Sequence, residues 1–363
     1  MAQRFPLIAR PRPACLPLPQ RVRALVELAD TAARLHDPSI ASTVYNQAAL
    51  IASDVEAWGV ARTMCHQHAA AYLSAVPLSG KAAIRCLEPV INLARLQIRS
   101  GQPNDGLQRL LTLFNNVRNG THLRVDDIVV PSRLTANAED RQEVCALLWR
   151  VLLADGTRAL TTAGRWTEAL AHVEAHRGIG QRMLDGRQVA VLAALAAGNT
   201  QGANNLLAET EPGTSWENDV TLCLSVLCLR ITGMAWRRPL QNLVTSYGER
   251  PDEEGITVFN VRLGLALLDT IPSPTDPAAR LLVSELHRRT RTAADGYAAR
   301  EALAHPLFAA LATDRQVRDC RELVLSCALE TGALPNQWRG RLAEALRTSD
   351  RTIRQSLIDG SGV

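Results

Sequence analysis

Three side chains between Glu168 and His176 have the spacing of metal ligands on a helix. Glu168, His172 and His176 follow one another at intervals of four residues. Residues four apart lie on one face of an α-helix, where two histidines can chelate a metal ion. The order His-Val-Glu-Ala-His differs from the His-Glu-x-x-His of zinc proteases, so the general-base role of that motif does not transfer. We expect a polar stripe on a helix here and no bound cofactor, with these three residues as the metal candidate.

A second candidate lies near the C-terminus, in the stretch LAEALRTSDRTIRQSL from Leu342 to Leu357. It resembles the helix-turn-helix of bacterial transcription regulators, which runs L-A-x-x-L-G-x-S-x-x-T-[IV]-x-x-x-[LI]. Arg347 stands where that family has glycine in the turn. The alternative is a pair of short terminal helices that cap a helical repeat. The resemblance implies that Ser349 caps the recognition helix. It also implies that four side chains face the DNA groove, namely Arg351, Thr352, Arg354 and Gln355.

The composition of the whole chain predicts a helical protein. Apolar residues make up 47% of the 363 residues and aromatic residues only 4%, so the core must consist mostly of alanine, leucine and valine. Alanine and leucine are strong helix formers, and strand patterns are nearly absent. The net charge of +4 is small, and acidic residues alternate with the basic ones, so the sequence shows no continuous basic stripe.

The cysteines and the apolar runs indicate a cellular compartment. None of the eight cysteines belongs to a Cys-x-x-Cys pair, and most lie in apolar helical stretches, so we expect buried free thiols. No apolar run reaches the length of a membrane span, and the N-terminus lacks the apolar core of a signal peptide. We therefore expect a cytoplasmic protein that has no membrane partner.

Two similar turns indicate an internal repeat. The turns Ala163-Gly164-Arg165-Trp166 and Ala197-Gly198-Asn199-Thr200 place their glycines 34 residues apart. Each glycine follows an apolar helical run and is followed five residues later by a small residue, Ala169 or Ala203. This is the layout of a helix-turn-helix repeat of about 34 residues.

Further residues carry a resemblance to the tetratricopeptide repeat over roughly residues 20–235. In that family, helix A has a large-x-x-large-small pattern and helix B has alanine, an aromatic residue and alanine. The matching residues are Leu25, Leu28 and Ala29 for helix A, Ala41, Tyr45 and Ala48 for helix B, and Trp166 with Ala169 around the turn at Gly164. The resemblance implies an all-α, right-handed solenoid of antiparallel helix pairs with a C-terminal helical cap region.

The distribution of prolines and polar residues predicts the boundaries. Residues 1–19 are rich in proline and arginine and are expected to form a flexible arm. The repeat domain is expected over residues 20–270, with a loop insertion at residues 119–140 where β-branched and polar residues interrupt the helical pattern. The proline-rich break from Ile271 to Pro277 either separates this domain from a C-terminal helical region at residues 277–363 or is simply a loop.

A solenoid of this type implies binding of a protein or peptide partner on its concave face. We expect a bacterial adaptor or regulatory protein without catalysis of its own, and possible homodimers. From helix phase, the candidate contacts are Asn92, Arg95, Arg150 and Arg158. A ligand-sensing regulator that binds DNA through residues 342–357 is the first alternative. A helical enzyme or its accessory protein is the second, although no nucleophile, base and orienting group come together in the sequence.

Overall fold

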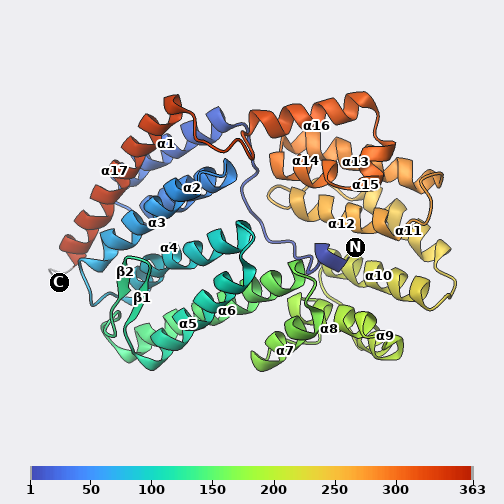
Figure 1. Ribbon diagram of the computed structural model, residues 1–363, viewed down its shortest axis with the longest axis horizontal. Helices are drawn as coiled ribbons and strands as arrows, with labels where there is room; N and C mark the ends of the chain where they lie inside the picture. Colours follow the sequence, from blue (N-terminus) through green and yellow to red (C-terminus); the bar gives the residue numbers. More distant parts are fainter. Residues whose placement is uncertain (1, 361–363) are drawn as a thin grey trace. The chain divides into compact units, whose positions relative to one another are not determined.

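The computed structural model describes residues 2–360 and is almost entirely helical (Figure 1). The described residues form seventeen α-helices and one short hairpin, which confirms the predicted all-α class. The chain divides into two compact units. Unit 1 consists of Met1–Pro17 and Leu160–Cys327, and unit 2 consists of Leu18–Ala159 and Ala328–Val363.

Unit 2 combines the first helices of the chain with the last one. Its elements are α1 (Leu18–Leu35), α2 (Pro38–Asp54), α3 (Trp58–Leu73), α4 (Gly80–Arg99), α5 (Pro103–Asn119), β1 (Leu123–Val125), β2 (Ile128–Val130), the greater part of α6 (Ala138–Thr162) and α17 (Asn336–Gly360). From α1 to α5, each helix packs against the next one in the sequence. The last helix, α17, packs against α1, α2 and α3, so the first three helices and the last one share one apolar core (Figure 1).

Unit 1 contains the middle of the chain and its N-terminal segment. Its elements are the 3₁₀ turn η1 (Ala2–Arg4), α7 (Trp166–Ala175), α8 (Asp185–Ala196), α9 (Thr200–Ala208), α10 (Ser215–Ile231), α11 (Arg237–Glu249), α12 (Thr257–Thr270), α13 (Pro277–Ala293), α14 (Gly296–Leu303), α15 (Pro306–Leu311) and α16 (Asp314–Ser326). Consecutive helices from α7 to α15 pack against one another. The centre of this core is α12, where a run of aliphatic side chains is buried on all sides.

Turns are present at both of the predicted glycines, Gly164 and Gly198. Gly164 and Gly198 have positive φ angles of 72° and 74°, a backbone conformation that glycine adopts without steric penalty after a helix end. The helices that follow, α7 and α9, begin two residues after each glycine. Ala169 and Ala203 are completely buried on those helices, as small residues must be where two helices cross closely.

The expected loop insertion at residues 119–140 connects α5 to α6 and contains a short hairpin. Strands β1 and β2 pair antiparallel, with Leu123 opposite Val130 and Val125 opposite Ile128. These apolar side chains face the core of unit 2, while the alternate residues are exposed, which is the pattern of a strand buried on one side. Beyond the hairpin, the main chain of Leu134 accepts a hydrogen bond of 2.8 Å from the Leu78 amide.

Of the expected flexible arm at residues 1–19, residues 2–17 are instead a packed segment of unit 1, and Leu18 and Pro19 begin α1 of unit 2. Phe5, Leu7 and Cys15 are each at most 2% exposed. The residues from Phe5 to Pro17 form no helix or strand, because prolines at four of these positions restrict the backbone and lack an amide hydrogen. The segment is therefore extended, as the composition predicts, but its apolar side chains are held in the core.

The proline-rich break at Ile271–Pro277 lies inside unit 1, between α12 and α13, which pack against each other. The helices expected as one C-terminal region at residues 277–363 fall into different units: α13 to α16 belong to unit 1 and α17 belongs to unit 2. The helical pattern of the sequence is interrupted here because a helix begins: Pro277 is the first residue of α13, and the side chain of Asp276 caps this helix.

The predicted C-terminal helix-turn-helix is wrong, because α17 is one continuous helix from Asn336 to Gly360. Leu342, Leu346 and Ile353 lie on one buried face of it, and Arg347 occupies the middle of the helix where the motif needs a turn. No glycine or proline interrupts the stretch from Leu342 to Leu357. This face packs against α1 and α2, and this packing stabilises a continuous helix rather than a turn.

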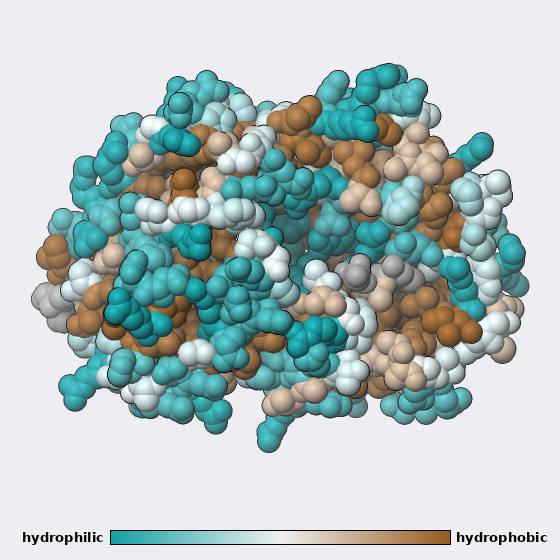
Figure 2. Space-filling model, viewed as in Figure 1, coloured by the Kyte–Doolittle hydropathy of each residue, from teal (hydrophilic) through white to brown (hydrophobic). Residues whose placement is uncertain are grey.

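All eight cysteines are free, and all except Cys145 are buried, in agreement with the sequence analysis. No helix of the described residues is both long and apolar enough to cross a membrane. The face seen in Figure 2 mixes hydrophilic and apolar side chains, and large exposed apolar residues such as Leu281 and Leu325 lie on different helices.

The packing of α17 predicts unequal effects of the same substitution at two of its positions. Ile353 is completely buried and Ile358 is 69% exposed. Replacing Ile353 with alanine should lower the free energy of unfolding by about 2–5 kcal/mol, because it leaves a cavity in the core. The control Ile358→Ala should change it by less than about 0.5 kcal/mol. Urea denaturation followed by circular dichroism measures both, and equal effects would contradict the packing described.

Candidate functional site

The N-terminal segment lies against unit 1 as an extended peptide whose backbone is held by a side chain. Leu7 is 1% exposed, so its main-chain amide and carbonyl cannot reach water. The amide of Leu7 donates to Gln188 Oε1 at 2.7 Å, and Gln188 Nε2 donates to the Leu7 carbonyl at 2.8 Å. One carboxamide therefore satisfies both groups, in the way that a neighbouring strand would.

Gln188 is positioned by the start of α8. Its side chain is completely buried, and its Nε2 also donates to the carbonyl of Met183 at 3.1 Å. This third hydrogen bond orients the carboxamide independently of the N-terminal segment. A buried polar side chain with a fixed orientation is the arrangement expected of a recognition group rather than of a solvated surface residue.

Two ion pairs hold the segment on either side of Leu7. Arg4 Nε lies 2.8 Å from Asp269 Oδ2 at the end of α12, and Arg10 lies 2.8 Å from Asp185 at the start of α8. The first pair is about four-fifths buried and the second is more exposed. An Asp185 carboxylate in the first turn of a helix is also favoured by the helix dipole.

Asp269 is the centre of a small buried charge network. His305 Nδ1 accepts a hydrogen bond from the Phe308 amide, so His305 Nε2 carries the proton that it shares with Asp269 Oδ1 at 3.1 Å. Burial alone would raise the pKa of Asp269, but the hydrogen bonds from His305 and Arg4 outweigh it and hold this pKa well below its usual range. Asp269 is therefore charged at neutral pH and attracts Arg4.

The second half of the segment is held through its main chain. The Arg12 amide donates to the Gly255 carbonyl at 3.0 Å, and the Cys15 carbonyl accepts from the Gly296 amide at 2.8 Å. Gly255 has a φ of +83°, and a Cβ atom built there would lie 3.2 Å from Pro11 Cβ. A residue with a side chain at position 255 would be strained and would crowd the segment.

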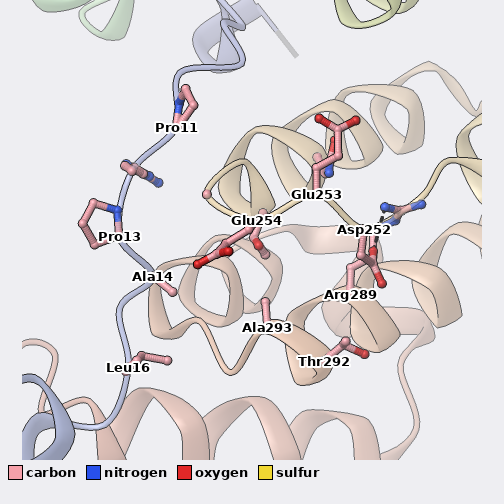
Figure 3. Close-up of a pocket in the computed structure, with 14 residues that line it drawn as sticks. Pro11, Pro13, Ala14, Leu16, Asp252, Glu253, Glu254, Arg289, Thr292 and Ala293 are labelled. Carbon is pink, nitrogen blue, oxygen red and sulfur yellow. Dashed lines mark hydrogen bonds and ion pairs between the residues drawn. The ribbon is translucent and has the colours of Figure 1, made fainter.

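A cavity of about 840 Å³ lies between this segment and the helices of unit 1 (Figure 3). Prolines and small apolar residues of the segment form one wall. The loop between α11 and α12, together with α12 and α13, forms the other. Its polar lining residues are Arg12, Asp252, Glu253, Glu254, Thr257, Asn260, Arg289 and Thr292. In Figure 3, Asp252 faces Arg289, whereas Glu254 extends towards the segment.

The structure brings together two of the predicted partner contacts. On α4, Arg95 donates to Asn92 Oδ1 at 3.2 Å, and Asn92 donates to Asn46 Oδ1 on α2 at 2.9 Å. Arg95 also forms an ion pair of 2.7 Å with Asp155 on α6. A row of polar side chains therefore crosses α2, α4 and α6 of unit 2, with Arg95 about half exposed.

The row continues to a carboxyl group that the sequence analysis did not single out. Asn46 Nδ2 donates to Glu88 Oε2 at 2.7 Å. Burial raises the pKa of Glu88, although the hydrogen bond from Asn46 and nearby arginines oppose this. The other two predicted contacts, Arg150 and Arg158, lie on α6 with exposed side chains.

The metal candidate does not assemble. The rings of His172 and His176 do lie together, with centroids 4.5 Å apart. Glu168, however, pairs with Arg165, and His176 Nδ1 lies 2.8 Å from the main-chain carbonyl of His172. Within residues 2–360, no group of three or more potential ligands has a metal-binding arrangement.

Of the residues predicted to contact DNA, two lie in the core of unit 2 and three are exposed on α17. Ser349 and Thr352 are buried in the core of unit 2, and Arg354 pairs with Asp350 one turn earlier in the same helix. Arg351 and Gln355 are exposed, and Gln355 bonds to Asp359. Ser349 lies inside α17 and therefore cannot cap a recognition helix.

Comparison with known proteins gives no relative. No protein-family model, no curated protein and no solved structure matches the chain. Sequence reasoning missed Gln188 and Asp269, and the only signal was the presence of Phe5 and Leu7 in an otherwise proline- and arginine-rich stretch.

Replacing Gln188 with leucine should release the N-terminal segment. The substitution leaves the buried amide and carbonyl of Leu7 unpaired, at about 1–3 kcal/mol for each group. Thermolysin should then cut between Leu7 and Ile8 at least about ten times faster, because the open form is more populated. Intact-mass spectrometry measures the rate. Gln201→Leu, at an exposed glutamine of α9, is the control, and equal cleavage of both variants would contradict the clamp.

Acid should weaken the docking of the segment through Asp269. The folded-state pKa of Asp269 lies below its unfolded value, so its contribution is complete above that value and is lost as the pH falls. We expect stability to drop below about pH 4, where an unfolded aspartate begins to bind protons. Asp269→Asn should lower stability by about 1–3 kcal/mol at pH 7 and flatten the pH dependence.

Thermal unfolding between pH 3 and pH 7 checks the role of Asp269. The control is Asp30→Asn, at an exposed aspartate of α1. If Asp269→Asn kept the pH dependence of the wild-type protein, the low pKa of this group would be refuted.

Proposed function

We propose that this protein is a helical-repeat module that binds an extended peptide segment of a partner and has no catalysis of its own. In this proposal the helices form a right-handed solenoid of antiparallel pairs. Sequential packing of neighbouring helices and the recurrent glycine turns support that arrangement.

The observation that carries the proposal is the capture of Leu7 by Gln188. Extended peptides offer a recognition surface two kinds of group: main-chain amides and carbonyls, which are common to all sequences, and side chains, which differ. Gln188 pairs with the first kind, and the core around Leu7 together with Asp185 recognises the second. Unit 1 therefore already has the chemistry needed to hold an extended chain.

The N-terminal segment acts in this proposal as a ligand in cis. A partner segment with an apolar residue followed three residues later by arginine presents the same groups as Leu7 and Arg10. Such a segment would compete for Gln188 and Asp185. Adaptor and regulatory proteins use competition of this kind to couple binding to a change of state.

The polar row on unit 2 is the second proposed contact surface. Asn92 and Arg95 offer amide and guanidinium groups that can bind main-chain carbonyls or carboxylates. Arg150 and Arg158 add exposed positive charge on α6. The hydrogen bonds among Asn46, Asn92 and Arg95 orient these groups in advance, which reduces the entropy lost on binding.

A peptide of residues 2–17 tests the proposal in trans. In the full-length chain, Leu7→Asp should release the segment, because a charged side chain cannot occupy the apolar site of Leu7. A fluorescently labelled peptide should then bind this variant at least about ten times more tightly than it binds the wild-type chain, where the cis segment competes. Fluorescence anisotropy measures both affinities.

Two controls make the result specific. Adding Gln188→Leu to the Leu7→Asp chain should abolish binding of the peptide, and a peptide that itself carries Leu7→Asp should not bind. If thermolysin shows that the segment is released and the peptide still fails to bind, the proposed function is wrong.

A further inference from the structure

A groove lies in unit 2 between α3 and α17, and α2 contributes Tyr45 to its lining. Its volume is about 630 Å³, which is within the usual range for sites that bind small molecules. Val60 and Met64 of α3 line one side, and Leu342 and Leu346 of α17 line the other. The walls of the groove are therefore largely apolar.

The charges that line the groove do not cancel. Within the described part of the chain they are three arginines and one aspartate, all on α17. Arg354 Nε donates to Asp350 Oδ2 at 2.8 Å, so these two charges compensate each other. Arg339 and Arg347 form no ion pair with any residue from 2 to 360. Glu344 lies between them in the sequence, but it is exposed and does not line the groove.

The two uncompensated arginines lie on one side of α17. Arg339, Ala343 and Arg347 follow one another at intervals of four residues, so each arginine is about 6 Å along the helix axis from Ala343. Arg339 Nε donates to the carbonyl of Leu334 at 3.1 Å, and its terminal nitrogens have no partner among residues 2–360. Ala343 has only a methyl group, so it leaves room for an anion between the two guanidinium groups.

A nearly buried donor also opens onto the groove. Tyr45 is 3% exposed, and its hydroxyl forms no hydrogen bond with any residue from 2 to 360. The ring of His68 stacks on Tyr45 with centroids 4.9 Å apart, but His68 Nε2 is fully enclosed whereas the Tyr45 hydroxyl is not. Burial raises the pKa of Tyr45, so the hydroxyl keeps its proton. A donor in this position points to an acceptor supplied by a ligand.

The surroundings of the hydroxyl indicate which kind of acceptor it binds. The negative charge of Asp350 adds to the rise in the pKa of Tyr45, and Arg354 opposes it, so this ion pair lies near the hydroxyl. A second carboxylate at the hydroxyl would be repelled by Asp350. The acceptor at Tyr45 is therefore a neutral oxygen, and the place for an anionic group is beside Arg339 and Arg347.

We propose that this groove binds a small apolar carboxylic acid that has a second, neutral oxygen, as N-acylated amino acids do. The carboxylate faces Arg339 and Arg347, the neutral oxygen accepts from Tyr45, and the apolar chain lies against Met64 and Leu346. All of these residues belong to unit 2, whereas the N-terminal segment belongs to unit 1. The inference is therefore independent of the proposed function.

The first experiment compares N-octanoylglycine with N-octanoylglycinamide, which differ little in shape but differ in charge. With the full-length wild-type chain at low salt, isothermal titration calorimetry should show at least about tenfold tighter binding of the carboxylate. This preference should shrink in about 0.5 M sodium chloride, because salt screens exposed charges. N-acetylglycine, which lacks the apolar chain, should bind at least about tenfold more weakly. Equal binding of the three compounds, or no binding of N-octanoylglycine, would overturn the inference.

Variants of α17 then assign the charge contacts. Arg339→Gln and Arg347→Gln should each weaken binding of N-octanoylglycine about fivefold. The matched control is Arg351→Gln, at an exposed arginine of the same helix that does not line the groove, and it should leave binding unchanged. Circular dichroism checks that each variant stays helical. Weakening by Arg351→Gln that equals the weakening by Arg347→Gln would overturn the assignment.

Tyr45→Phe tests the neutral oxygen. It removes only the hydroxyl and keeps the ring that stacks on His68. Undecanoate has a chain of similar length to N-octanoylglycine but lacks the amide carbonyl. The ratio of the two affinities, in favour of N-octanoylglycine, should fall about fivefold in Tyr45→Phe. An unchanged ratio would show that Tyr45 does not donate to the ligand and would overturn its role.

The C-terminus of an apolar peptide shares the chemistry of a carboxylate next to a carbonyl. The probe for this source is the tripeptide N-acetyl-Ala-Leu-Leu with a free carboxylate. We expect it to bind more weakly than N-octanoylglycine, because its additional amides find no partners along the apolar walls. Tighter binding of the tripeptide that is weakened by Arg347→Gln would overturn the assignment of a small acid and place a peptide C-terminus in the groove.

Discussion

The buried main chain of Leu7 depends on a side chain for its hydrogen bonds. A proline-rich segment cannot form a helix or a full strand ladder, so its amides and carbonyls need partners from elsewhere once they leave water. Gln188 provides both partners from the first turn of α8. The rest of the segment passes close to Gly255, and Pro11 and Pro13 line the cavity beside it.

Buried charges are handled in the same way in both units, by surrounding a carboxylate with donors. In unit 2 the completely buried side chain of Asp54 accepts from Arg21 and Arg99, each at 2.6 Å. In unit 1 Asp269 accepts from Arg4 and His305. Such groups add little stability over apolar packing, but removing one partner leaves a charge uncompensated. They therefore specify which elements pack together, and Asp269 specifies where Arg4 of the N-terminal segment lies.

The cavity differs from these networks because its polar groups are only partly satisfied. The Nη1 and Nη2 groups of Arg289 are engaged by acceptors, whereas Arg289 Nε and Asn260 Oδ1 have no hydrogen-bond partner among the described residues. Unsatisfied polar groups are uncommon in protein interiors.

Local patterns in the sequence determined the helical class, the two glycine turns and the burial of the cysteines. Each of these depends on residues close in the chain: alanine- and leucine-rich helical periods, the conformational freedom of Gly164 and Gly198, and thiols set in apolar runs. Asn92 and Arg95 were also within reach, because a spacing of three residues places them on one helix face.

Tertiary structure alone decided the rest. Leu7 and Gln188 are 181 residues apart, and no local period relates them. The sequence from Leu342 to Leu357 matches the pattern of a helix-turn-helix motif. It forms part of a single helix because one continuous buried face packs against α1 and α2. The stretch 277–363 was divided between the units because α13 packs with α12 and α17 packs with α1. Contacts between distant segments are selected by the shape and polarity of the surfaces that meet, and those surfaces exist only once the helices have formed.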